Sequence, residues 1–332
     1  MAGVATLSRK NWARLFPLPN WVYNCGNKKP SSLNEGREGR LMNWPIARRR
    51  FLSLSAGAVA AGLLGRGAAV ASDSESVRFG LTPVLLTSDL NLLDLLQSYL
   101  ETSTGRSVEL VTRRTYQEIS ALLISSQLDG AWICSPPFLT YQAELELSAV
   151  PVWNGKPLYR SYLIADAHRN ASSIDDLAGD IHAFSDPDSN SGYVATAAEL
   201  ARKGEKPQTF FRRIFFTYGH ENVVRAVASG LAQSGSVDGY VYEVLKEMEP
   251  SLTSLTRVVR PSPWYGFPPI AGPLAAVGTK KRDQLRNALL TTHEDPKGQE
   301  LLKALRLDAF ADEPPSLFAS VAENMALLRG LG

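Results

Sequence analysis

The feature that most restricts the fold of this chain is a regular alternation, from residue 76 onward, of short apolar runs with amphipathic segments. The strand-like runs are 77–81, 108–112, 130–134, 158–166, 182–184, 215–217 and 237–241. The helix-like segments are 90–101, 116–126, 174–177 and 221–230, with others near 191 and from 280 to the end. Strands that alternate with helices usually form parallel sheets that helices cover on both faces. The pattern therefore predicts an α/β fold.

Charge is distributed unevenly along the chain. Residues 1–71 contain 11 lysines and arginines but only two acidic residues, out of 35 basic and 33 acidic residues in all. Residues 72–332 therefore carry a formal charge of about −7. Nucleic-acid binding requires a basic face, so this acidic body argues against nucleic acid as a partner.

The basic excess surrounds a motif that resembles a protein export signal. The sequence Ala-Arg-Arg-Arg-Phe-Leu-Ser at 47–53 contains the pair Arg48 and Arg49. An apolar stretch follows at 54–64, and a small-x-small cleavage pattern ends at Ala71. The apolar stretch is about half of the ~20 residues that a membrane span needs. We interpret the segment as a twin-arginine signal, which implies export of the folded protein to the periplasm.

The start of the translated protein is expected at Met42, a normal distance before the arginine pair. On this interpretation residues 42–71 are the signal peptide and residues 1–41 are an upstream extension. Cys25 lies in that extension, so Cys134 is the single cysteine of the exported chain. One cysteine cannot form a disulfide within the chain, and stability must then come from the hydrophobic core.

A polar segment, Phe-Ser-Asp-Pro-Asp-Ser-Asn-Ser-Gly-Tyr at 184–193, joins a predicted strand to a predicted helix. Unpaired amides and the positive end of the helix dipole favour an anion at such a helix start. The hydroxyls of Ser189 and Ser191 and the amide of Asn190 are suited to bind oxyanion oxygens. The alternative is a structural role in which these residues cap the helix.

Two further strand ends carry polar residues. His220 stands at the start of the helix that follows 215–217. Its ring either faces the same cleft as the polar segment 184–193 or has a structural role. Asp238 ends the next strand, where it either binds a cation or hydroxyl or caps the following helix.

Four segments carry a resemblance to a known family: SDPDSNSGY at 185–193, FTYGHENVVRAVASG at 216–230, SVDGYVYEVL at 236–245 and SPWYGFPPI at 262–270. Together they resemble the phosphate-, phosphite- and phosphonate-binding proteins of ABC importers, which are type II periplasmic solute-binding proteins. The similarity extends over about residues 76–310.

The resemblance implies a two-lobed α/β fold in which each lobe is a mostly parallel sheet covered by helices, with the ligand between the lobes. Two crossing segments join such lobes, and 158–166 and 256–262 are the candidates. We therefore expect residues 76–163 and 257–332 to form lobe I and residues 164–256 to form lobe II.

The resemblance also implies site residues. The family's Ser-Thr-Ser anion cradle falls on Ser189, Asn190 and Ser191. Its cleft histidine falls on His220, and the aspartate of its next strand end falls on Asp238. The implied ligand is a phosphonate, phosphite or phosphate, held without a cofactor or metal ion. The implied partner is an ABC permease, and we expect a monomer.

Two departures from the family pattern affect the expected pocket. Phe138 stands where family members often carry a tyrosine, and the loop at 82–87 lacks the tyrosine expected there. Fewer hydroxyls in the pocket argue against a large phosphonate.

Cys134 ends a predicted strand beside the expected cleft. A thiol there is suited to trivalent arsenic, which favours sulfur. Related binding proteins that sense arsenite for the periplasmic domain of a histidine kinase use a cysteine in this way. The alternative is a small buried hydrophobic residue. The sequence does not separate an importer subunit from such a sensor.

A hydrolase is the remaining alternative. Ser191, His220 and Asp238 are the residue types of a catalytic triad, but the chain lacks a G-x-S-x-G elbow. Its four histidines are scattered singly, without the spacing of a zinc site. We therefore expect a binding protein and not an enzyme.

Overall fold

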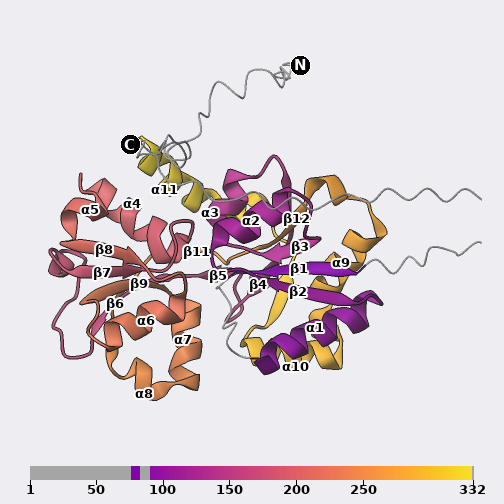
Figure 1. The fold of residues 1–332 in the computed structure, drawn as a ribbon, viewed down its shortest axis with the longest axis horizontal. Helices are drawn as coiled ribbons and strands as arrows, with labels where there is room; N and C mark the ends of the chain where they lie inside the picture. Colours follow the sequence, from indigo (N-terminus) through magenta and orange to yellow (C-terminus); the bar gives the residue numbers. More distant parts are fainter. Residues whose placement is uncertain (1–75, 83–89, 331–332) are drawn as a thin grey trace, which may run out of the picture. The chain divides into compact units, whose positions relative to one another are not determined.

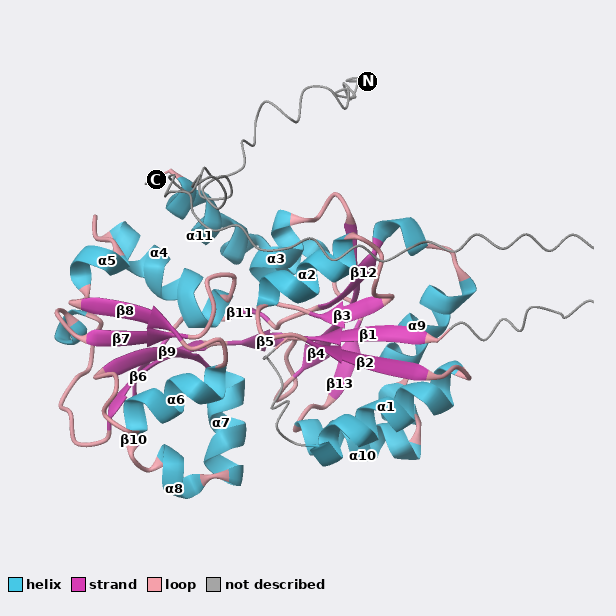
Figure 2. Ribbon diagram, viewed as in Figure 1, coloured by secondary structure: helices cyan, strands magenta, loops and turns pink. Residues whose placement is uncertain are grey.

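The computed structural model describes residues 76–82 and 90–330. Outside this part lie Arg48, Arg49 and Ala71, the segments 1–41 and 42–71, and residues 83–87 of the loop that lacks a tyrosine. The described residues form an α/β structure with two main sheets (Figure 1 and Figure 2). No described helix combines the length and the hydropathy that crossing a membrane requires.

Lobe I is built on a six-stranded sheet in the order β13-β4-β12-β3-β1-β2. Its strands are β1 (Val77–Leu81), β2 (Val108–Thr112), β3 (Gly130–Trp132), β4 (Leu145–Val152), β12 (Ile270–Pro273) and β13 (Ala309–Ala311). Its helices are α1 (Leu90–Thr104), α2 (Tyr116–Ile124), α3 (Ser135–Thr140), α9 (Lys280–Leu290) and α10 (Pro296–Leu305). A side chain at Gly80 would meet Ile119 of α2, whereas the neighbouring Phe79 lies on the face that holds Leu285 of α9. Successive residues of a strand point to opposite faces, so helices cover both faces of this sheet.

Lobe II is built on a five-stranded sheet in the order β10-β6-β9-β7-β8. Its strands are β6 (Ser161–Asp166), β7 (Ile181–Phe184), β8 (Arg213–Phe216), β9 (Ser234–Asp238) and β10 (Thr256–Pro261). Its helices are α4 (Ala195–Arg202), α5 (Pro207–Phe210), α6 (His220–Ala228), α7 (Gly239–Met248) and α8 (Pro250–Thr253). Ser234 and Ser236 of β9 hydrogen-bond the two ring nitrogens of His182 on one face. A side chain at Gly235 would meet Val223 of α6 on the other face. One face of β9 therefore has polar contacts, and its other face packs against apolar side chains of α6.

Both sheets are mixed, which corrects the prediction of mostly parallel sheets. In lobe I, β1 pairs in parallel with β2 and β3, but β12 runs antiparallel to β3 and β4, and β13 runs antiparallel to β4. In lobe II, β7 pairs in parallel with β8 and β9, but β6 runs antiparallel to β9 and β10. The strands that run against the main direction are β6 in lobe II and β12 and β13 in lobe I. Two of them, β6 and β12, are the strands by which the chain enters each sheet from the other lobe.

The lobes are joined by a two-stranded ribbon, in which β5 (Leu158–Tyr159) pairs antiparallel with β11 (Tyr265–Gly266). The second sheet begins at Ser161 and ends at Pro261, so the predicted boundaries at 163/164 and 256/257 fall inside β6 and β10. The sequence predicts one strand over 158–166, whereas the structure divides this segment at Arg160 into β5 and β6.

The last helix, α11 (Ala319–Arg329), provides a third connection between the lobes. It contacts α3 of lobe I and also α4 of lobe II. We expected the whole segment 257–332 in lobe I, but this helix lies against both lobes.

Candidate functional site

The turn that holds Ser189, Asn190 and Ser191 lies between strand β7 and helix α4. It takes the form of a π-helical turn, Asn190–Val194, and such wide turns are frequent at functional sites. All three side chains are completely buried. The Ser189 hydroxyl oxygen accepts a hydrogen bond from the backbone amide of Gly192 at 3.0 Å. The capping role that the sequence offers for this serine is therefore present.

Asp238 lies at the end of β9 and caps α7. Its Oδ1 accepts hydrogen bonds from the backbone amides of Tyr240 (2.9 Å) and Val241 (3.3 Å). Its Oδ2 accepts a hydrogen bond from the hydroxyl of Ser191 at 3.3 Å. Burial raises the pKa of this carboxyl to about 7, although the amides and the hydroxyl lower it. The same carboxylate therefore fixes a helix start and the orientation of a turn serine.

His220 is the first residue of α6, and its side chain is buried. Its Nδ1 accepts the backbone amide hydrogen of Asp238 at 3.1 Å. The ring proton must then be on Nε2, which lies 3.2 Å from the hydroxyl oxygen of Tyr116. Burial lowers the pKa of His220 to about 3, so the ring is neutral. Since Nε2–H donates to the tyrosine oxygen, the Tyr116 hydroxyl keeps its own proton for another acceptor.

Lobe I contributes three buried polar residues to the same place. The backbone amide of Asn190 donates to Sγ of Cys134 at 3.3 Å. The side-chain amide nitrogen of Asn190 donates to the hydroxyl of Tyr159 at 3.1 Å. The backbone amide of Tyr116 donates to Oδ2 of Asp186 at 3.2 Å. These contacts join the two lobes at the ends of several strands, which is where ligands bind in open α/β sheets.

The electrostatic character of this cluster is unusual for an anion site. Asp186 and Asp238 are both buried, and burial raises the pKa of each. Asp188 lies beside Asp186, and its pKa rises to about 6 through burial and the charge of Asp186. Among the described residues, no lysine or arginine forms a hydrogen bond or ion pair with these three acids. Within the described part of the chain, helix starts, among them those of α4, α6 and α7, supply partial positive charge here.

Two buried polar atoms of the turn have no hydrogen-bond partner within the described part of the chain: Oδ1 of Asn190 and Oγ of Ser185. Buried polar atoms are rarely left unpaired, so these atoms mark the turn as a place that a further polar group could complete. Gly192 allows the close packing here, because a Cβ at this position would lie 1.7 Å from Oγ of Ser185.

The structure brings together six of the seven predicted ligand-binding residues: Cys134, Ser189, Asn190, Ser191, His220 and Asp238. Phe138 is the exception. Its ring packs against Phe318 with 5.5 Å between ring centroids, as part of the lobe I core. The helix that holds Phe138 has only six residues and begins with two prolines, so its sequence has no periodicity that distinguishes a core position from a pocket position.

Tyr116 and Tyr159 were not predicted as site residues, yet both hydroxyls lie in the cluster. They supply hydroxyls to a site that was expected to have fewer of them, because Phe138 and the loop at 82–87 lack the tyrosines of the family pattern. One local signal was available for Tyr116. It follows Thr115, which forms a capping box with Glu118 and so places the start of α2 just after strand β2. Tyr159 has no comparable signal, because its role depends on the pairing of β5 with β11.

The hydrolase alternative requires a serine hydroxyl bonded to the histidine. Here Ser191 donates to Asp238, while His220 bonds the backbone of Asp238 and the hydroxyl of Tyr116. The histidine is thus not aligned with the Ser191 hydroxyl, as a serine–histidine triad requires. In the described residues no three histidine, cysteine or acidic side chains gather as a metal-ligand set.

Two α/β lobes joined by a short ribbon, with a buried polar cluster between them, define the periplasmic binding protein class. The fold is similar to a binding protein component of an ABC phosphonate transporter from Pseudomonas aeruginosa, with a TM-score of 0.72 and 19% identity over 78% of this chain and 88% of that one. It is also similar to PhnD1 from Prochlorococcus marinus in complex with methylphosphonate, with a TM-score of 0.68 and 16% identity over 77% of this chain and 99% of that one.

The sequence profile described as ABC transporter, phosphonate, periplasmic substrate-binding protein matches residues 79–315. This chain belongs to that family, which consists of transport proteins and is not an enzyme family. The phosphate-import protein PhnD of Mycolicibacterium smegmatis is 30% identical over 176 residues, which are 48% of this chain and 54% of that protein. The match therefore spans about half the length of this curated relative.

Proposed function

We propose that this chain binds a small phosphorus oxyanion between its two lobes in the periplasm and delivers it to the permease of an ABC importer. The observation that carries the proposal is the buried polar cluster, where a serine-rich turn and two helix starts from lobe II meet Cys134, Tyr116 and Tyr159 from lobe I. Two relatives support the ligand class, since one is named for phosphate import and another was solved with methylphosphonate.

The donors in this cluster suit an oxyanion with several oxygens. The hydroxyls of Ser189 and Tyr116 can each donate to an oxygen, and a ligand oxygen can replace Asp238 as the acceptor of the Ser191 hydroxyl. The helix starts add partial positive charge. Asp186 and Asp238 are acceptors when ionised, so a protonated oxygen of the ligand would be paired best beside them. Phosphate, phosphite and alkylphosphonates all carry such an oxygen in their singly charged forms.

The arsenite alternative depends on Cys134. Burial raises the pKa of this thiol to about 12, and arsenic binds the thiolate. The sulfur also accepts the Asn190 amide hydrogen, and it is the only sulfur ligand that the described residues place in the cluster. These observations favour the reading of Cys134 as a small buried residue that lines the site. The same chemistry gives no support to a sensor of arsenite.

The proposal is tested by calorimetric titration of the purified protein with methylphosphonate, phosphite, phosphate, sulfate and arsenite. At least one phosphorus oxyanion should bind, and Ser191→Ala should weaken it about ten- to a hundred-fold, because a hydrogen bond to a charged group contributes ~1.5–3 kcal/mol. Ser254→Ala, an exposed position beyond α8, is the matched control and should leave the affinity unchanged. Binding of arsenite alone, or equal effects of the two substitutions, would contradict the proposal.

A further inference from the structure

The C-terminal helix α11 extends from lobe I onto lobe II. Just before it, Phe318 is fully buried and packs against Phe138 of α3 in lobe I. Further along, the helix contacts α4 of lobe II and the π-helical turn that precedes α4 (Figure 1). Lobe II therefore has a neighbour that is neither of the two crossing segments.

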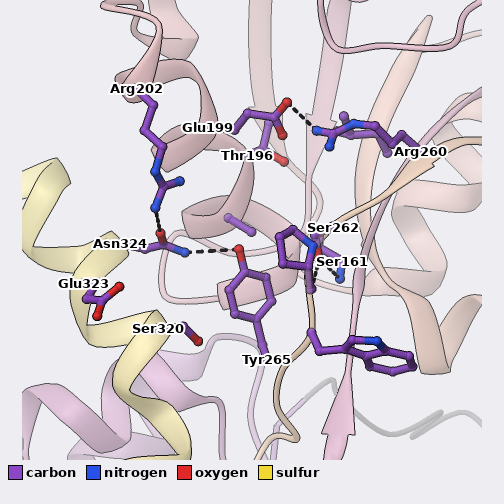
Figure 3. Close-up of a pocket in the computed structure, with 14 residues that line it drawn as sticks. Ser161, Thr196, Glu199, Arg202, Arg260, Ser262, Tyr265, Ser320, Glu323 and Asn324 are labelled. Atoms are coloured by element: carbon purple, nitrogen blue, oxygen red, sulfur yellow. Dashed lines mark hydrogen bonds and ion pairs between the residues drawn. The ribbon is translucent and has the colours of Figure 1, made fainter.

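Asn324 is the polar residue that α11 places in this contact, and its side chain is 2% exposed. Its Oδ1 accepts a hydrogen bond from the guanidinium of Arg202 at the end of α4, and its Nδ2 donates to the hydroxyl of Tyr265 at 3.2 Å (Figure 3). A buried amide whose oxygen and nitrogen both have partners has one preferred orientation, because any other leaves polar groups unpaired.

These hydrogen bonds connect α4 and α11 to the ribbon that joins the two lobes. Tyr265 of β11 pairs with Tyr159 of β5, and the hydroxyl of Tyr159 accepts from the side chain of Asn190. Asn190 begins the turn that continues into α4, and α4 ends at Arg202. The path from Arg202 through Asn324 and the ribbon thus returns to the serine-rich turn. Beside these residues lies a cavity of about 310 Å³, which is lined by residues of α4, α11 and the crossing segments.

We propose that Asn324 is a positioning residue for the ligand site. By tying the end of α4 to the interlobe ribbon, it holds the turn of Ser189 to Ser191 at its spacing from Tyr159. It acts through Arg202 and Tyr265, the two residues that its side chain hydrogen-bonds. The part of this inference that concerns affinity depends on the function proposed above, whereas the part that concerns lobe spacing does not.

The inference predicts coupled effects on binding. Asn324→Leu keeps the size of the side chain and removes both hydrogen bonds, and Tyr265→Phe removes one of them. Each should weaken methylphosphonate binding about two- to ten-fold, which corresponds to ~0.4–1.4 kcal/mol. Because the two residues act as one link, the double variant should resemble Asn324→Leu alone. Asn287→Leu, at an exposed position of α9, is the control.

If Asn324 had only a structural role, these variants would melt at a lower temperature, but the folded molecules would bind methylphosphonate as the wild type does. The two substitutions would then show no coupled effect on affinity. That result would overturn the inference.

Lobe spacing provides the readout that needs no ligand. Spin labels on Ser103→Cys in α1 and Gln208→Cys in α5, both exposed, report the distance between the lobes. Asn324→Leu should broaden or shift the distance distribution of the ligand-free protein, and Asn287→Leu should not. If the wild type binds none of the tested oxyanions, the proposed function fails, and the label distances still decide the role of Asn324. An unchanged distribution would refute that role.

Discussion

Gly192 gives the sharpest test of how the serine-rich turn is built. Its backbone is not in the left-handed region, so alanine is excluded only by space. A Cβ there would lie 1.7 Å from Oγ and 2.7 Å from Cβ of Ser185, and 3.0 Å from Oγ of Ser189. Rotating the Ser185 hydroxyl relieves the first contact but leaves the second below any normal carbon–carbon separation. Gly192→Ala must therefore displace the turn.

Overpacking of a well-packed core costs ~1–3 kcal/mol, occasionally more, and we expect Gly192→Ala to lose at least that much unfolding free energy in urea. Ligand affinity should fall about ten-fold or more, because the displaced turn carries Ser189 and Ser191. The matched control is Gly330→Ala at the end of α11, where the nearest atoms lie 3.6 and 3.8 Å from the added Cβ.

A second substitution separates this steric account from a general intolerance of the site. Ser185→Gly removes both atoms that clash, so the double variant with Gly192→Ala should recover most of the lost stability. Ser185→Ala removes only the hydroxyl and leaves the 2.7 Å contact, so its double variant should recover less. The reasoning is refuted if Gly192→Ala is as stable as the wild type, or if Ser185→Gly restores nothing.

The other predictions concern charge, hydrogen bonding and export. The folded protein keeps the proton of Asp238 up to about pH 7, whereas the unfolded chain releases it near ~4, so the stability of the wild type falls as pH rises between these values. In urea unfolding, Asp238→Asn should therefore gain up to ~1.4 kcal/mol of unfolding free energy per pH unit relative to the wild type over this range. Parallel pH profiles of the two proteins would contradict this prediction. Tyr116→Phe leaves the buried Nε2–H of His220 without its acceptor and should cost ~1–3 kcal/mol in the same assay, an unchanged midpoint being the contrary result. Cys134→Ser keeps an acceptor for the Asn190 amide and should change phosphorus oxyanion affinity less than Cys134→Ala does; complete loss of binding in the serine variant would favour sulfur ligation. Replacing Arg48 and Arg49 by lysine should block export in cell fractionation, and normal export would argue against a twin-arginine signal.

Some properties of this protein follow from short stretches of sequence. The alternation of apolar and amphipathic segments predicts the α/β class, and the polar segment at 184–193 predicts a strand, a turn and a helix start. The capping role of Asp238 is local as well, since its carboxylate binds amides two and three residues ahead. These predictions succeed because the hydrogen bonds and apolar contacts that decide them join residues that are close in the chain.

Tertiary structure alone decided which residues meet between the lobes. Cys134 and Asn190 are 56 residues apart and Tyr116 and His220 are 104 apart, so no local pattern pairs them. The direction of the strands next to the crossings and the position of Asn324 on α11 depend in the same way on how the chain returns to each sheet. Local propensity specifies each helix start, but the site forms only when burial brings the separate starts to one place and leaves their polar groups no partners except one another.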